Sequence, residues 1–200
     1  GGKVTTDDNI EITADEFELI KDINLLTATG NAIMNDYDND IQIIANQFEY
    51  KKNIDLIKAT GNVVLYDKIK NAKIYTNEIY YNKDKEEIYT KGKTNSTIDE
   101  EITIKSSNVL FRRNENTLSS SNSSEVQDKQ KRLYKLDSFK YFITEELLKG
   151  TNVKIFDITN DEYFMKEGFF DLKKKKFSAQ DLKINFKKDL FDDIKNDPRL

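Results

Sequence analysis

The side chains that could carry out chemistry are few in kind, because the 200 residues include no histidine and no cysteine. The usual nucleophile and base pairs are therefore missing, and acid–base work would fall to carboxylates, lysines or tyrosines. Carbohydrate-active β-helix enzymes use such carboxylates and would repeat one acidic residue on one face. No Asp or Glu recurs in all six of the repeat units described below. We therefore expect no catalytic residues and no cofactor.

Three aspartates have the spacing of a calcium-binding loop. They are Asp36, Asp38 and Asp40 in "NDYDND". An EF-hand would need glycine at the position of Ile41 and glutamate at the position of Gln47. We therefore interpret this stretch as a hairpin turn and predict no metal site.

Charge and length limit the other classes of function. The net charge is -4, from 32 Lys and Arg against 36 Asp and Glu, which gives no reason to expect a nucleic-acid partner. "KKKK" at 173–176 could meet phosphate groups, but a solvated turn is favoured. No apolar run is long enough to span a bilayer as a helix. The start, "GGKVTTDDN", lacks the apolar segment of a signal peptide, so an exported protein would be in mature or trimmed form here.

The elements that must position any site follow from an internal repeat. Six blocks succeed one another at strides of 31, 31, 30, 30 and 30 residues. They are "ITADEFEL" at 12, "IIANQFEY" at 43, "IYTNEIYY" at 74, "IKSSNVLF" at 104, "YKLDSFKY" at 134 and "FMKEGFFD" at 164. The first and sixth positions are apolar in every block, and so is the eighth except at Asp171, where Leu172 would take the place. The repeat is therefore one of buried positions.

The second half of the unit repeats around a glycine. "LTATGNAIM" at 26, "IKATGNVVL" at 57 and "IYTKGKTNS" at 88 carry Gly30, Gly61 and Gly92. At 118–132 the match fades, and we expect a loop or a weak edge strand there. The fifth unit has Gly150, two residues early by the stride. We expect these glycines to be structural, with Gly61 bending a strand where a Cβ would clash.

Inside each unit the apolar period is two, which is the period of a β-strand. Between Ala14 and Phe17 the apolar parity flips, so a bulge or bend there would keep both halves facing inward. Each unit then contains two bent strands joined by polar turns. A single unit cannot bury its own face, but six stacked units share one interior. The sequence predicts one all-β domain over 1–200, a folded-over antiparallel sheet of about a dozen strands, weakest at 113–133.

The unit "IIANQFEYKKNIDLIKATGNVVLYD" resembles the repeat of the OstA-like lipopolysaccharide-transport family. The family has an "A-x-x-Φ-x-Y" block that leads into "L-x-x-T-G-N-V-x-Φ", where Φ is an apolar residue. The matching residues are Ala45, Phe48, Tyr50, Leu56, Thr60, Gly61, Asn62 and Val63. The match is strong for 10–66, fair to about 112 and positional beyond. The C-terminal "KKDLFDDIKNDPRL" at 187–200 is similar to the segment that leads from the N-terminal periplasmic domain of LptD toward its outer-membrane barrel.

The resemblance implies a fold, a ligand and partners. The fold would be the LptA-like β-jellyroll, and its apolar groove would bind the lipid A acyl chains of lipopolysaccharide. The partners would be an LptA-type bridge protein, added at an edge strand, and an LptE-like lipoprotein with the barrel. The location would be the periplasm, at the periplasmic face of the outer membrane. A complete LptA-type bridge protein is the alternative, followed by a carbohydrate-binding or structural β-repeat protein.

The predicted groove comprises the rows of apolar side chains that the repeat aligns. They are Phe17, Leu19, Met34, Phe48, Tyr50, Val63, Leu65, Ile79, Tyr81, Val109, Phe111, Phe139, Tyr141 and Phe169. For any one of them, ordinary core packing is favoured over contact with lipid.

Overall fold

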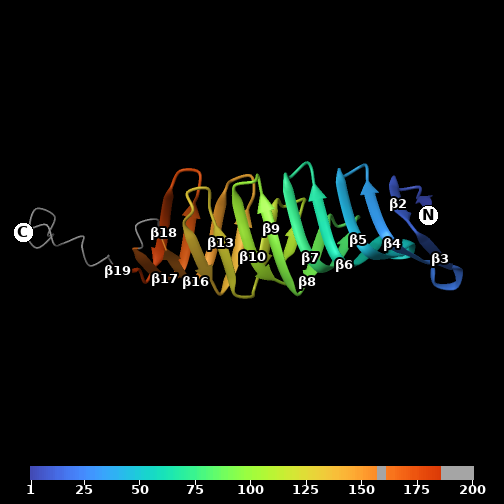
Figure 1. The fold of residues 1–200 in the computed structure, drawn as a ribbon. Coiled ribbons are helices and arrows are strands. Elements are labelled where there is room, and N and C mark those ends of the chain that lie inside the picture. Colours follow the sequence, from blue (N-terminus) through green and yellow to red (C-terminus); the bar gives the residue numbers. More distant parts are fainter. Residues whose placement is uncertain (157–160, 186–200) are drawn as a thin grey trace, which may run out of the picture.

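The structure, a computed structural model, describes residues 1–156 and 161–185, which form one elongated antiparallel sheet (Figure 1). Its strands are β1 (Gly2–Thr5), β2 (Ile10–Ala14), β3 (Glu16–Ile20), β4 (Leu25–Asp36), β5 (Ile41–Lys51), β6 (Leu56–Asp67), β7 (Ala72–Asn82), β8 (Glu87–Lys91), β9 (Lys93–Ile98), β10 (Ile102–Ser107), β11 (Leu110–Arg112), β12 (Thr117–Ser120), β13 (Ser124–Gln127), β14 (Leu133–Leu136), β15 (Ser138–Phe142), β16 (Leu147–Phe156), β17 (Glu162–Asp171), β18 (Lys176–Gln180) and β19 (Lys183–Asn185). Two 3-10 turns, η1 (Lys21–Ile23) and η2 (Lys52–Ile54), interrupt them. The prediction of an all-β, folded-over jellyroll is confirmed.

The sheet is folded because each strand of the repeat bends near its middle. Layer A consists of β1, β2, 32–36, 41–45, 63–67, 72–76, β9, β10, β13, β14, 152–156, 162–165 and β19. Layer B consists of β3, 25–29, 47–51, 56–60, 78–82, β8, β11, β12, β15, 147–151, 167–171 and β18. The described part has nineteen strands, because several strands of the repeat are interrupted at the bend and count as two.

The Ala-Thr-Gly-Asn segments form the bends of β4 and β6. Gly61 and Asn62 have φ angles of +80° and +49°, in the left-handed region that glycine adopts freely and asparagine tolerates. The register of β6 against β7 shifts between Thr60 and Val63, as a bulge requires. A Cβ on Gly61 would lie 2.5 Å from Nδ2 of Asn46. The strand therefore bends at Gly61, and the group that leaves no room for a Cβ there is the Asn46 side chain.

We expect Gly61→Ala to destabilise the protein more than Gly92→Ala. Gly92 has a similar φ of +84°, but a Cβ there would meet nothing within 4 Å. Both changes place a side chain in the left-handed region, which costs about 1–2 kcal/mol, and only Gly61→Ala adds the clash with Asn46. Urea unfolding of the two variants measures the difference. Equal losses would contradict the close approach at Gly61.

The core lies between the two layers, where the inward side chains of both meet. Its fully buried members include Ile12, Met34, Ile43, Phe48, Leu65, Ile74, Ile79, Ile104, Phe111, Val126 and Leu148. They alternate along each half-strand with outward side chains, as the period of two predicted. Leu172 is buried, but it does not take the place of Asp171 as the sequence predicted, because strand pairing aligns Phe170 with Tyr141 through Leu148. Each unit thus contributes one slice of a continuous apolar interior.

In the last repeat the inward-facing positions are shifted by one residue from those that the sequence predicted. Phe169 is 39% exposed, whereas Phe170 is 2% exposed. The physical reason is the pairing of β16 with β17, which aligns Leu148 with Phe170. Tyr141 in turn pairs with Leu148, so these three residues share the inward face. The final stride is therefore 29 rather than 30 residues, and the prediction that Phe169 faces the interior is wrong.

The segment 118–132 is not the loop or weak edge strand that the sequence predicted. It contains most of β12 and all of β13, and each of these strands is paired on both sides. Buried hydroxyl groups take the place of apolar side chains. For example, the Ser120 hydroxyl donates to the backbone carbonyl oxygen of Ser107 at 2.6 Å. The Ser124 hydroxyl donates to the backbone carbonyl oxygen of Asn122 at 2.7 Å. Strand pairing therefore continues where the sequence pattern fades.

Gly150 is structural, but it is not a bend of the Gly61 kind. The left-handed residue of β16 is Asn152, with φ of +47°, and Gly150 has no positive φ. Gly150 instead makes room for a neighbour, because a Cβ there would lie 2.2 Å from Leu136 Cδ2. The predicted linker at 187–200 lies outside the described residues.

Candidate functional site

Most of the predicted groove residues form a closed core. Met34, Phe48, Tyr50, Val63, Leu65, Ile79, Tyr81, Val109, Phe111, Phe139 and Tyr141 are all buried. Their side chains pack against one another and against the opposite layer, which is the ordinary core interpretation. Leu19 and Phe17, both in β3, are the exceptions at the N-terminal end. Leu19 is 58% exposed, and Phe17 is half-buried against the core.

The exposed side chains of β3 line an apolar groove at the N-terminal end of the molecule. The groove has a volume of about 400 Å³. It is lined by Val4, Thr5, Thr6, Asp7, Phe17, Leu19, Asn24, Leu26, Tyr50 and Lys52. Tyr50 belongs to the core cluster and Leu26 packs against it, so the end of the core forms the inner wall of the groove. The N-terminal end of the core is therefore reached between β1 and β3.

A second, smaller hollow lies near the other end of the described strands. It has a volume of about 100 Å³ and is lined mainly by aromatic and aliphatic side chains. Phe170 packs edge-on against Tyr134, with ring centroids 5.1 Å apart, and both rings line the hollow. The packed core separates this hollow from the N-terminal groove.

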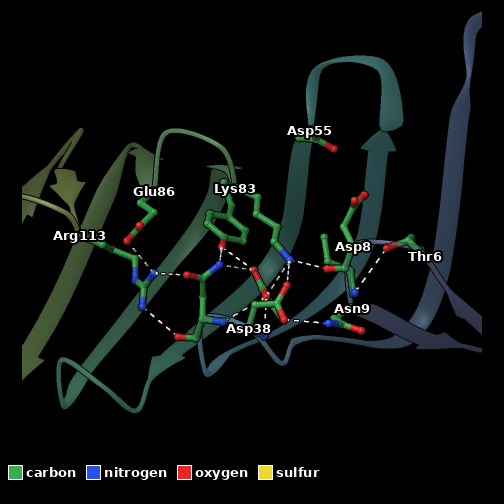
Figure 2. Close-up of polar contacts among 12 residues, drawn as sticks. Thr6, Asp8, Asn9, Asp38, Asp55, Lys83, Glu86 and Arg113 are labelled. Atoms are coloured by element: carbon green, nitrogen blue, oxygen red, sulfur yellow. Dashed lines mark hydrogen bonds and ion pairs between the residues drawn. The ribbon is translucent and has the colours of Figure 1, made fainter.

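The long side of the interior opposite the bends is closed by polar groups. We call this side the mouth; it is formed by hairpin turns of layer A, such as 37–40, and of layer B, such as 83–86. Lys83 reaches across it from layer B, and its ammonium donates to Asp36 at 3.2 Å and to Asp38 at 2.9 Å. It also donates to the carbonyl oxygen of Asp8 (Figure 2). One lysine thus joins both layers and the β1–β2 turn.

Arg113 makes the second crossing of the mouth, and its side chain is 1% exposed. Its Nε donates to Asp67 Oδ2 at 2.5 Å. Its two Nη groups donate to the side-chain and backbone oxygens of Asn39 at 3.1 and 2.9 Å (Figure 2). Nη1 of Arg113 also donates to Glu86 Oε2 at 3.3 Å. A buried guanidinium is therefore paired with a buried carboxylate and hydrogen-bonded on several sides, as a buried charge requires.

Electrostatics favours the charged forms of both cations. Burial by itself lowers the pKa of Lys83, but hydrogen bonds to Asp38 and Asp36 raise that pKa overall. For Arg113, burial lowers the pKa and the contact with Asp67 raises it above its ordinary value. Both groups therefore remain cationic across the physiological pH range.

The cluster of side chains that closes this part of the mouth is called the polar seam. It consists of Asp36, Asp38, Asn39, Asp67, Tyr81, Lys83, Glu86 and Arg113.

Nearer the C-terminal end the mouth is bridged by more exposed pairs. Lys129 pairs with Glu146 at 3.2 Å and with Glu101 at 3.5 Å, and its side chain is 30% exposed. Lys70 donates to Asn116 at 2.5 Å. Exposed pairs of this kind contribute little, about 0–1 kcal/mol each. The strongest closure of the mouth is therefore at the polar seam.

Tyrosine hydroxyls in the interior differ in their partners, which gives a testable contrast. Tyr81 donates to Asp36 at 2.6 Å, whereas the Tyr141 hydroxyl has no hydrogen-bond partner among the described residues. We expect Tyr81→Phe to lower the free energy of unfolding by about 1–3 kcal/mol, because the bond is to a buried carboxylate. Tyr141→Phe should change it by less than about 0.5 kcal/mol. Urea unfolding tests this, and similar losses in both variants would contradict it.

Sequence reasoning missed the polar seam. Asp36 and Asp67 occupy the same position of successive units, 31 residues apart, which was the available signal. Their partners Lys83 and Arg113 also occupy one position of successive units, 30 residues apart, but only the folded chain brings this basic position to the acidic one. The predicted hairpin at 36–40 is confirmed, with Asp36 Oδ1 accepting from the backbone N–H of Asp38 at 3.1 Å. The lysine run at 173–176 likewise lies at the turn between β17 and β18.

The described residues contain no group of acidic side chains that could hold a metal ion. None of their helices is long and apolar enough to cross a membrane.

The fold and site together define a class: an elongated all-β repeat protein with an apolar interior, a polar seam and an open N-terminal end. Comparison with known proteins gave no matching family model and no matching curated protein. Among solved structures the chain is similar to LptH of Pseudomonas aeruginosa, the LptA-homologous periplasmic component of the lipopolysaccharide transport device. The identity is 10%, the TM-score is 0.26, and the alignment covers 89% of this chain and 94% of LptH.

Proposed function

We propose that this protein is a periplasmic lipopolysaccharide-binding conduit domain that takes lipid A acyl chains into its apolar interior. The observation that carries the proposal is the N-terminal groove, whose apolar walls continue into the core between the layers. The resemblance of the 30-residue repeat to the OstA-like family supports the same role. We expect no catalytic step.

The energetics of an acyl chain explain why such an interior is needed. A chain of about a dozen methylenes gains about 10 kcal/mol when it leaves water, at about 0.8 kcal/mol per methylene. Release of several chains into water is therefore negligible. An interior that accepts a chain at successive positions lets the lipid move without exposure. Because the middle of this interior is fully packed, deeper entry requires the two layers to separate at the mouth.

Photo-crosslinking tests the proposal at adjacent residues of one strand. Leu19 lines the groove, whereas Ile20 is 39% exposed and does not line it. With a photo-reactive amino acid at Leu19 we expect capture of lipopolysaccharide, and with the same amino acid at Ile20 we expect little. The same contrast is expected between Tyr50, at the inner wall, and exposed Lys51. Equal capture at all four positions, or none at any, would refute the interior as the lipid site.

The open strands at the N-terminal end favour partner binding by strand addition. Among the described residues, β1 pairs only with β2 and β3 only with β4, so each has one edge without a partner strand there. Unpaired N–H and C=O groups can extend a sheet onto another chain. An LptA-type bridge protein is the proposed partner there.

Within this class we favour the N-terminal domain of an LptD-type protein, which would act with an LptE-like lipoprotein at the outer membrane. The similarity of 187–200 to the segment that precedes the LptD barrel supports this choice. The gene sequence after Leu200 discriminates it from an LptA-type bridge protein. Several hundred further residues of alternating strands would support LptD, and a stop codon at that point would favour LptA.

A further inference from the structure

The outer face of layer A carries two neighbouring hollows that the interior does not use. One has a volume of about 580 Å³ and the other about 470 Å³. Asn95 lines the larger hollow and Thr97 lines the smaller one, and both side chains project outward from β9. Tyr75 pairs with Asn95 across β7 and β9, which joins the hollows along the strands. The two hollows therefore adjoin on this face, and we call them together the outer depression.

The strand register lines the outer depression with cations. One row of cross-strand neighbours runs from strand to strand across the outer face of layer A. It consists of Tyr75, Asn95, Lys105, Glu125, Lys135, Lys154 and Phe164. Lys135 pairs with Glu125 at 3.2 Å and Lys154 with Glu162 at 3.3 Å. In the part of the chain that the structure describes, Lys93 and Lys105 form no ion pair, although both line the depression and are exposed. In a chain with net charge -4, six lysines against four carboxylates line the two hollows, so positive charge is in excess here.

A lysine held between two tyrosines marks the mouth side of the outer depression. The Lys73 ammonium lies 4.8 Å from the Tyr66 ring centroid and 4.7 Å from that of Tyr75. Hydrogen bonds with Tyr75 and Tyr66 raise the pKa of Lys73, so it stays charged. Tyr75 is 41% exposed. The site therefore combines a positioned cation with an accessible aromatic ring.

The remaining lining groups are the carboxylates of Asp67, Glu100 and Asp137 and several neutral hydrogen-bonding groups. Asn95, Thr97, Ser107, Ser123 and Asn152 offer amide and hydroxyl groups along the depression. Hydroxyls and amides can both donate to and accept from sugar hydroxyls. Aromatic faces pack against the C–H groups of sugar rings, and ammonium groups attract phosphate. We propose that the outer depression of layer A is a binding site for a phosphorylated oligosaccharide.

This proposal concerns a surface separate from the interior, so a ligand without acyl chains tests it alone. The probe is the phosphorylated oligosaccharide obtained by complete removal of the acyl chains from lipopolysaccharide. Calorimetry gives its affinity, and amide chemical shifts locate the site. We expect shifts at Tyr75, Asn95 and Lys105, and affinity that falls as salt is raised, because exposed charges are screened. Dephosphorylated probe should bind about ten-fold or more weakly.

Paired variants separate a built site from general charge attraction. Lys93→Ser with Lys105→Ser removes two charges from the outer depression, and we expect affinity to fall about ten-fold or more. Lys91→Ser with Lys149→Ser removes two charges from strands of layer B, and we expect a change below about two-fold. Circular dichroism of both variants checks folding. Failure of the lipid crosslinking above would leave these expectations unchanged.

Four results would overturn the proposal. They are absence of binding, shifts confined to the interior, and equal loss of affinity in the two paired variants. The fourth is tighter binding of a single-stranded DNA oligonucleotide of equal charge than of the oligosaccharide, which would assign the depression to nucleic acid.

Discussion

Arg113→Ala is expected to lower the free energy of unfolding by about 3–5 kcal/mol, because it leaves the Asp67 carboxylate buried without its partner. Asp67 has no exposed side-chain surface, and its bond from Arg113 is 2.5 Å long. The change also removes both donors to Asn39, which holds the layer A turn against layer B. Urea unfolding monitored by circular dichroism measures the loss.

The neighbouring Arg112 is the matched control for this effect. It pairs with Glu87 at 2.9 Å, but its side chain is 36% exposed. Arg112→Ala should therefore cost about 0–1 kcal/mol. A double change, Arg113→Met with Asp67→Leu, removes both buried charges and should recover much of the stability lost in Arg113→Ala. If Arg112→Ala costs as much as Arg113→Ala, burial at the polar seam is not what makes the pair strong.

The polar seam also controls the proposed lipid entry. Variants that weaken it should let the layers separate more often, which hydrogen exchange reports as faster exchange of the amides in 36–40 and 83–86. In the Arg113→Ala variant, crosslinking of lipopolysaccharide at Phe111 should increase relative to the unmodified protein. Unchanged capture at Phe111 together with faster exchange would show that the lipid does not enter through the mouth.

Phe170→Ala is expected to lower the free energy of unfolding by about 3–5 kcal/mol, because it removes a large ring from the core and leaves a cavity. The ring is 2% exposed and packs edge-on against Tyr134. It also closes the end of the row that Tyr141 and Leu148 begin. Thermal and urea unfolding both measure the effect.

Phe169→Ala is the control one residue earlier. This ring is 39% exposed on the outer face of layer B, where Lys149 lies 4.2 Å from its centroid. We expect a loss below about 1 kcal/mol. The two variants therefore test the 29-residue stride directly. A larger loss at Phe169 than at Phe170 would restore the stride of 30 that the apolar pattern predicted.

The sequence pattern was sufficient where each repeat carries its own local signal. Alternation of apolar and polar residues predicts which face of a strand is buried, and that prediction holds for Phe48, Leu65 and Phe111. The bend at Gly61 and Asn62 is also local, because both residues must adopt positive φ. The pattern failed at 118–132, where hydrogen bonds of buried serines replace the apolar signal. It failed again at Phe169, because two adjacent phenylalanines leave the parity undetermined.

The sequence by itself determined the class of fold, the bends and most of the inward rows, since period and backbone preference act over a few neighbouring residues. Only the tertiary structure decided how the interior is closed and where it opens. The polar seam joins Asp36 to Lys83 and Asp67 to Arg113, groups more than forty residues apart. Their contact depends on folding the sheet until the hairpin turns of both layers meet. The open groove at Leu19 likewise exists because, within 1–156 and 161–185, β3 pairs with no strand other than β4.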